Sequence, residues 1–186
     1  MRILAVPAAA LMALAPAGHL AAGSGPRFNF RVPTLSGGTI TQEDFKGKLV
    51  VVDVWATWCG PCRMVIPHLV RLQDKFKAQG VAVVGLNADL EDLGPGTDLE
   101  PIRSFARSYG MNYPIGLMTP ETYREVARVM GFDLDRGMSI PTTIIIGRNG
   151  RVLQRYPGYF PGQEREIDGI LVSILEAEAA QKDKSP

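Results

Sequence analysis

The two cysteines of this 186-residue chain, Cys59 and Cys62, lie three positions apart in the segment WATWCGPCRM. A pair with this spacing serves thiol–disulfide exchange, a structural disulfide or metal binding. A structural bridge across two residues removes little entropy from the unfolded chain. A structural zinc site takes four ligands, and the only histidines are His19 and His68. We expect His68 to be solvated and unpaired. The spacing therefore favours exchange chemistry, with a copper-handling module that binds Cu(I) through both thiolates as the alternative.

The positions of the two sulfurs predict different roles in exchange. Cys59 directly follows a strand-to-helix junction, where the helix dipole and free backbone N–H groups stabilise a thiolate. Because the thiolate is the attacking species, we expect Cys59 to be the solvent-open nucleophile. Cys62 begins the apolar stripe of the helix, so we expect it to be shielded and to resolve the mixed disulfide. Pro61 suits the first helical turn and stiffens the loop between the sulfurs.

A carboxylate interrupts the apolar strand that leads to the cysteines. Asp53 lies six residues before Cys59 in KLVVVDVWA, and burial of a carboxylate without a partner is costly. Burial should raise the pKa of Asp53, and groups with shifted pKa values cluster at functional sites. We therefore expect Asp53 to exchange a proton with Cys62. The alternative is a partly hydrated polar residue at a strand end.

The elements around these residues alternate between buried strands and amphipathic helices. Near-continuous β-branched runs predict strands buried on both faces, and three- to four-residue apolar spacing predicts helices. We expect strands at 48–56, 81–89, 112–118, 142–147 and 151–156, helices at 60–78, 99–110, 119–132 and around 167–175, and an N-terminal hairpin at 28–48. This alternation predicts an α/β sheet covered by helices on both faces.

The first residues have the pattern of an export signal. Arg2 precedes an apolar run at 3–15 and a stretch of small residues, which are the three regions of a secretory signal. We expect residues 1–22 to be a signal peptide, with an uncleaved membrane anchor as the alternative.

Composition bounds the remaining function classes. With 46% apolar and 21% charged residues, the chain suits one soluble domain with its own core. Without the leader, 19 basic residues face 19 acidic ones. A net charge near zero gives no reason to expect a nucleic-acid partner, and we expect a monomer.

The segment VDVWATWCGPCRMVIP closely resembles the active-site segment of thioredoxin, with matches at Asp53, Trp55, Trp58, Cys59, Gly60, Pro61, Cys62 and Pro67. SIPTTIII resembles the cis-proline segment of that family, which implies a cis bond at Ile140-Pro141. NGRVLQRYPG resembles the hairpin that follows and places Gly158 at the substrate-contact glycine. The resemblance implies a thioredoxin fold, a central mixed sheet with helices on both faces, over residues 27–180, followed by a disordered tail at 181–186.

The same resemblance implies where a client protein binds. A cis bond beside the sulfurs would expose the backbone of Ile140, with which an extended client segment can pair as an added strand. Four aromatic rings would add apolar surface around this client-binding groove: Trp58, Tyr156, Tyr159 and Phe160. The implied substrate-binding residues are Trp58, Gly60, Pro61, Ile140, Pro141 and Gly158.

The leader, the N-terminal β-hairpin extension and a central insert between Leu90 and Thr119 make the chain similar to exported TlpA/ResA/DsbE-type reducing oxidoreductases. Such proteins act in the periplasm or on the outer face of the cytoplasmic membrane, often on apocytochrome c or copper-site assembly proteins. The resemblance implies electrons from a membrane thiol reductant resembling CcdA/DsbD, and no cofactor besides the redox-active disulfide Cys59–Cys62. The Gly60-Pro61 dipeptide matches thioredoxin, which implies a reducing enzyme. An oxidising or isomerising enzyme is the alternative.

Three positions depart from the relatives. Many members of the group carry a glutamate where this chain has Val65, and an asparagine where it has Asp53. Thioredoxin has a lysine facing its aspartate where this chain has Gly85. We therefore expect Asp53 to handle a proton without a lysine partner, and the departures weaken the implication that apocytochrome c is the client.

Overall fold

The computed structural model describes residues 24–89 and 96–183, so the predicted signal peptide at 1–22 lies outside the described residues. The described residues form a central five-stranded sheet in the order β5-β4-β3-β6-β7. Strands β3, β4 and β5 are parallel to one another, β6 pairs antiparallel with β3, and β7 pairs antiparallel with β6. The strands are β3 Leu49–Trp55, β4 Val81–Asn87, β5 Ile115–Leu117, β6 Thr142–Ile146 and β7 Val152–Pro157. The predicted mixed α/β sheet is confirmed.

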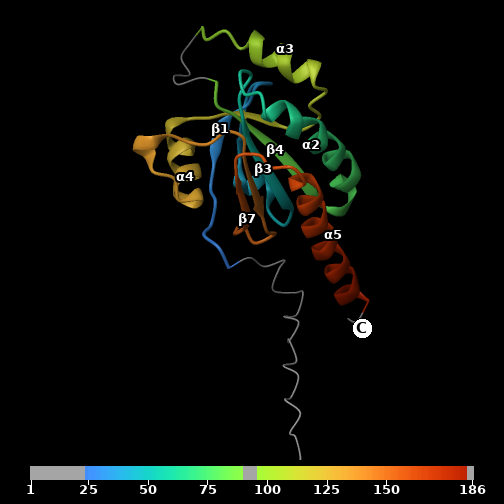
Figure 1. Ribbon diagram of the computed structural model, residues 1–186. Helices are drawn as coiled ribbons and strands as arrows, with labels where there is room; N and C mark the ends of the chain where they lie inside the picture. The colour runs from blue at the N-terminus through green and yellow to red at the C-terminus, as the bar shows by residue number, and fades with distance from the viewer. Residues whose placement is uncertain (1–23, 90–95, 184–186) are drawn as a thin grey trace, which may run out of the picture.

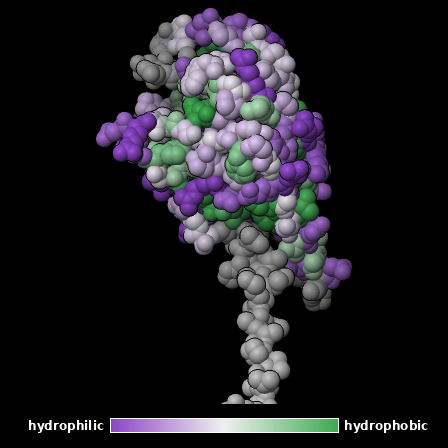
Figure 2. All heavy atoms as spheres, in the orientation of Figure 1, coloured by the Kyte–Doolittle hydropathy of each residue, from purple (hydrophilic) through white to green (hydrophobic). Residues whose placement is uncertain are grey.

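Helices cover both faces of this sheet, as Figure 1 shows. The surface in the same orientation is mostly hydrophilic, with small hydrophobic patches between the polar residues (Figure 2). One face of the sheet packs on α2 and α5, and the other packs on α4 and the N-terminal hairpin. Helix α3 lies near the end of the sheet where β3 leads into α2. The helices are α2 Cys62–Phe76, α3 Glu100–Ser108, α4 Pro120–Met130 and α5 Gln163–Lys182, and the hairpin consists of β1 Arg31–Pro33 and β2 Thr39–Thr41. Short 3₁₀ turns lie at Gln42–Phe45, Lys77–Gln79 and Leu134–Arg136.

The alternation of side chains along the central strand β3 determines which face of the sheet carries the site. All seven of its residues are buried, and successive side chains of a strand point to opposite faces. Val50, Val52 and Val54 pack in the cluster that includes α4. Leu49 and Val51 pack with α2 and α5. Asp53 therefore faces the same side as α2, the helix that begins with the second cysteine.

The N-terminal hairpin and the central insert both belong to the core. Leu35, just after β1, donates its backbone N–H to the carbonyl of Ile115 at 2.9 Å. Gly116 lets the hairpin approach, because a Cβ there would lie 2.4 Å from Cγ2 of Val32. In the insert, Ile102 of α3 packs in the cluster that holds Trp55 and both cysteines. These two additions therefore wrap the active-site end of the sheet.

Several element boundaries differ from the sequence-based ones. Helix α2 begins at Cys62 instead of residue 60, and the strand expected at 112–118 shortens to Ile115–Leu117. Helix α5 continues to Lys182, beyond the domain end expected at 180, and residues 184–186 lie outside the described residues. Within 24–89 and 96–183, no helix is both long and apolar enough to cross a membrane.

The expectation that His68 is solvated is wrong, whereas its imidazole Nε2 makes no hydrogen bond among the described residues, as the expected lack of a partner implies. His68 is only 8% exposed, because α5 covers this side of α2. Its Nε2 lies 3.4 Å from Oδ1 of Asp168 on α5, within reach of an ion pair but without hydrogen-bond geometry. Burial lowers the pKa of His68 despite the nearby carboxylate, so the imidazole is neutral near pH 7.

Candidate active site

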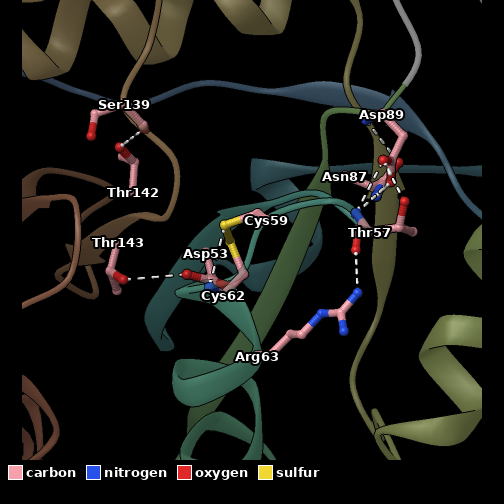
Figure 3. Close-up of a disulfide and its surroundings, with 10 residues drawn as sticks. All are labelled: Asp53, Thr57, Cys59, Cys62, Arg63, Asn87, Asp89, Ser139, Thr142 and Thr143. Carbon is pink, nitrogen blue, oxygen red and sulfur yellow. Dashed lines mark hydrogen bonds between the residues drawn. A yellow bond between two sulfur atoms is a disulfide. The ribbon is translucent and has the colours of Figure 1, made fainter.

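The two cysteines form a disulfide at the junction between β3 and α2. The sulfurs are 2.10 Å apart and the Cα atoms 5.4 Å apart, and Figure 3 shows the bridge with its surroundings. The backbone N–H of Cys62 donates to Sγ of Cys59 at 3.2 Å. Pro61 adopts helical φ and ψ at the N-cap. The sulfur of Cys59 therefore lies at the N-terminus of α2, where backbone N–H groups stabilise a thiolate.

The sulfurs are more enclosed than the sequence suggested. Cys62 is fully buried, as expected, but Cys59 is only 4% exposed instead of open. Ile140, far along the chain, packs against the cluster that contains both cysteines. The accessible surface around the pair comes mainly from Trp58, which is 67% exposed, and from the exposed Gly60 and Pro61. A disulfide that reacts with Cys59 must therefore reach its sulfur through a narrow opening.

A polar clamp that sequence reasoning missed fixes the loop before Cys59. The backbone N–H of Thr57 donates to both carboxylate oxygens of Asp89 at 3.0 Å, and its hydroxyl donates to Oδ1 at 2.7 Å. Asn87 donates its side-chain amide to the same carboxylate, and Arg63 donates to the Thr57 carbonyl at 3.2 Å. Figure 3 shows this clamp on the opposite side of the disulfide from Thr143. The only sequence signal was the polar Asn-Ala-Asp that ends the second buried strand.

Asp53 is a buried carboxyl with one hydrogen-bond partner. It is 0% exposed, which excludes the alternative of a partly hydrated strand end. The hydroxyl of Thr143, its neighbour on β6, donates to Oδ1 at 3.3 Å, and Gln163 donates to that hydroxyl at 3.3 Å. Burial raises the pKa of Asp53 to about 8, and the Thr143 hydrogen bond only partly opposes this. A carboxyl with this pKa can both accept and release a proton near neutral pH.

The structure explains two of the three departures from the relatives. Gly85 is the β4 neighbour of Asp53 in the ladder, as expected. A Cβ at Gly85 would lie 2.8 Å from Nε1 of Trp55 and 3.2 Å from Cε2 of Tyr113, so two rings occupy the space of a side chain. Val65 is 1% exposed and packs in the apolar cluster between α2 and the sheet, where an ionised glutamate would be costly.

The cis-proline segment lies beside the disulfide. The Ile140-Pro141 bond is cis, as the resemblance implied, and Gly158 donates its N–H to the Pro141 carbonyl at 2.7 Å. Gly158 has φ +82°, which an L side chain rarely adopts. Ile140 also lines a groove of about 530 Å³ whose other residues include Ala88, Met118, Tyr123, Arg124 and Met138. The groove therefore continues the surface around the sulfurs.

The described residues give no support to a metal centre built on conventional ligands. Among residues 24–89 and 96–183, no group of three or more His, Cys, Asp or Glu side chains is placed to hold a metal ion. The groups gathered at the junction of β3 and α2 are instead two sulfurs, a buried proton-exchanging carboxyl and a cis-proline. This set can carry out a two-thiol exchange reaction with a protein disulfide.

The sequence matches a family described as AhpC/TSA over residues 25–155. It is 31% identical over 130 residues to the thiol-disulfide oxidoreductase ResA of Bacillus thuringiensis subsp. konkukian, covering 70% of this chain and 66% of the relative. The thioredoxin-like protein YneN of Bacillus subtilis is 32% identical over 139 residues, covering 74% and 73%. A thiol:disulfide interchange protein from Chlorobium tepidum TLS superposes with a TM-score of 0.66 at 28% identity, covering 81% and 96%. The chain thus spans slightly less than two thirds of the length of the ResA relative.

Proposed function

Because this chain belongs to the AhpC/TSA family, within the TlpA/ResA/DsbE-like group of the thioredoxin superfamily, we propose that it is a protein-disulfide reductase. The observation that carries this proposal is the Cys59–Cys62 disulfide at the N-terminus of α2, on the face of the sheet that also holds Asp53. The ResA relative is named a thiol-disulfide oxidoreductase, and the Chlorobium tepidum protein is named a thiol:disulfide interchange protein.

The reaction uses the two sulfurs in sequence. In the reduced enzyme, the Cys59 thiolate attacks a client disulfide, one client sulfur leaves as a thiolate, and a mixed disulfide forms. The Cys62 thiol then transfers its proton to the Asp53 carboxylate and attacks Sγ of Cys59. The bond between Cys59 and the client breaks, the client leaves as its second thiolate, and the Cys59–Cys62 disulfide forms. The client gains two electrons, and the structure corresponds to the oxidised enzyme.

Client binding uses the exposed surface around the Cys59 sulfur. An extended client segment pairs with the backbone at Ile140, beside Pro141 and Gly158, and packs on Trp58, Gly60 and Pro61. The adjoining groove takes apolar client side chains, because two methionines line it and methionine adapts to varied partners. The enclosure of Cys59 supports this reading, since only a flexible or unfolded client can reach its sulfur.

We propose that the reductase works in the periplasm after export and acts as a monomer without a cofactor. A membrane thiol reductant resembling CcdA/DsbD regenerates the dithiol, since each turnover leaves the Cys59–Cys62 pair oxidised. Cytochrome c maturation is the candidate pathway. The ResA and DsbE names among the similar proteins support the proposed export and pathway.

Substrate trapping tests the proposal. Cys62→Ser in the full-length chain should accumulate a mixed disulfide between Cys59 and clients, because the resolving thiol is missing. The double variant with Cys59→Ser is the control and should trap nothing. Trapping by Cys59→Ser alone would reverse the assigned roles. If the wild-type protein reduces neither insulin nor a small disulfide and purifies with stoichiometric copper, the copper-handling alternative holds instead.

A further inference from the structure

Three buried polar groups without partners gather on the face of the sheet that carries the catalytic carboxyl. Among the described residues, Oδ2 of Asp53, Nε1 of Trp55 and the hydroxyl of Tyr113 have no hydrogen-bond partner. All three side chains are nearly or fully buried. Buried polar groups are almost always paired, so three exceptions in one place require an explanation.

Strand β4 places these groups around Gly85, which has no side chain. Asp53 pairs with Gly85 in the parallel ladder, and the Gly85 N–H donates to the carbonyl of Pro114, the residue after Tyr113, at 3.0 Å. The Trp55 indole nitrogen and the Tyr113 ring both come within 3.2 Å of where a Gly85 Cβ would be. Neighbouring strands lie about 4.8 Å apart, so Gly85 allows both polar side chains to lie against the flank of Asp53.

We propose that Tyr113 is a positioning residue for the resolving step, and that its hydroxyl, together with the Trp55 indole N–H, stabilises the ionised carboxylate of Asp53. The inference rests on the proposed function. A hydroxyl and an indole N–H both present positive hydrogens to a carboxylate. Stabilisation of the charged form favours the state that accepts the Cys62 proton.

Few other groups near Asp53 could stabilise its ionised carboxylate. From α2 the titratable neighbour is Cys62, and from β6 the neighbour is the neutral Thr143. Tyr156 of β7 lies beyond Thr143, and its hydroxyl donates to Glu166 of α5 at 3.0 Å. No charged group contributes to the pKa shift of Asp53 within the described residues. Burial, and after it the Asp53 carboxylate, raises the pKa of Tyr113 well above its usual value, so Tyr113 remains a neutral donor.

The Tyr113 ring lines an open groove of about 370 Å³ together with Leu35, Arg103, Met111 and Pro114, while its hydroxyl is buried. This groove lies on a different set of elements from the groove beside Ile140. A change at Tyr113 therefore leaves the groove beside Ile140 unaltered.

The test is a stopped-flow reaction of the reduced full-length protein with the dye 5,5′-dithiobis(2-nitrobenzoate), from pH 5 to pH 10. The first thionitrobenzoate released reports attack by Cys59, and the second reports resolution by Cys62. Tyr113→Phe should leave the first phase unchanged. It should slow the second phase roughly 3- to 10-fold at pH 7, because removing the nearby hydroxyl raises the pKa of Asp53 and leaves less carboxylate to accept the Cys62 proton. The two proteins should converge above about pH 9.5, where Asp53 is ionised in both.

Tyr109→Phe, at the C-cap of α3, is the matched control and should behave as wild type. The inference is overturned if Tyr113→Phe superposes on wild type at every pH, or if it slows the second phase equally at every pH, which indicates a packing effect. Asp53→Asn tests the role of Asp53 separately from that of Tyr113, since it should slow the second phase at pH 7 and leave only the pH dependence that comes from ionisation of the attacking thiol. A wild-type protein that releases no second thionitrobenzoate contradicts the proposed function itself.

Discussion

Replacing Asp53 with asparagine should remove a large pH dependence of stability. The pKa of Asp53 is about 8 in the folded protein, against 3.8 for an unperturbed aspartate. Between these values the unfolded chain carries an ionised carboxylate while the folded chain holds a proton. The free energy of unfolding then falls by about 1.4 kcal/mol per pH unit as the pH rises. The stabilisation is complete below pH 3.8 and is lost as the pH rises toward 8.

The expected size of the change in the free energy of unfolding follows from the interval between these two pKa values. From pH 3.8 to pH 7 the loss amounts to about 4 kcal/mol, a large part of the 5–15 kcal/mol typical of a domain. Asparagine cannot ionise, so Asp53→Asn does not suffer this loss. The variant should therefore gain about 4 kcal/mol relative to wild type between pH 4 and pH 7, whatever their difference at pH 4.

Urea unfolding of the oxidised full-length proteins at pH 4, 5, 6, 7 and 8 measures this difference. The disulfide should be kept oxidised throughout, so that thiol ionisation does not contribute. Asp74→Asn is the matched control, because Asp74 is an exposed carboxylate on α2 paired with Lys77, and its effect should stay within about 0.5 kcal/mol. Parallel stability curves for wild type and Asp53→Asn over this range would refute a buried carboxyl with a raised pKa.

Three further outcomes are expected from the same structure. Gly85→Ala should lower the free energy of unfolding by about 1–3 kcal/mol, because its Cβ would lie 2.8 Å from the Trp55 indole nitrogen; an unchanged urea midpoint would contradict this close approach. Asp89→Ala should cost about 2–3 kcal/mol in urea unfolding, since Thr57 loses hydrogen bonds to a charged acceptor, whereas Asp89→Asn should lose less. The redox pair should have a potential below about −200 mV in a glutathione titration, and a value near −120 mV would indicate an oxidising enzyme instead.

The parts of the site that are local in sequence were predictable. The Cys-x-x-Cys spacing, the junction between strand and helix, and the lone carboxyl in an apolar run all lie within ten residues. Period-two and period-3.6 patterns fix which side of an element is buried, so the face of Asp53 and the shielding of Cys62 followed from the pattern. The cis bond at Ile140-Pro141 did not follow from any pattern, because such bonds are a small minority, and only the resemblance implied it.

The features that the sequence-based predictions got wrong or missed depend on contacts between segments that are distant in the sequence. Cys59 is enclosed because the loop before β6 packs over it, and His68 is buried because α5 crosses its side of α2. The Thr57–Asp89 clamp joins residues 32 positions apart. Periodicity describes one element at a time and cannot say which neighbouring element will cover it.

The burial of Asp53 is the source of both its cost and its use. An exposed aspartate with a pKa near 3.8 would stay ionised at neutral pH and would be a poor proton acceptor for a thiol with an ordinary pKa of about 8.5. Raised to about 8, the carboxyl comes closer to the reference pKa of a thiol, so Asp53 can take a proton from Cys62 at a smaller free-energy cost than an exposed aspartate could. Water around the carboxyl would lower its pKa and increase that cost. The apolar neighbours on β3 and α2 that make the fold less stable at pH 7 are therefore the same groups that prepare Asp53 for the resolving step.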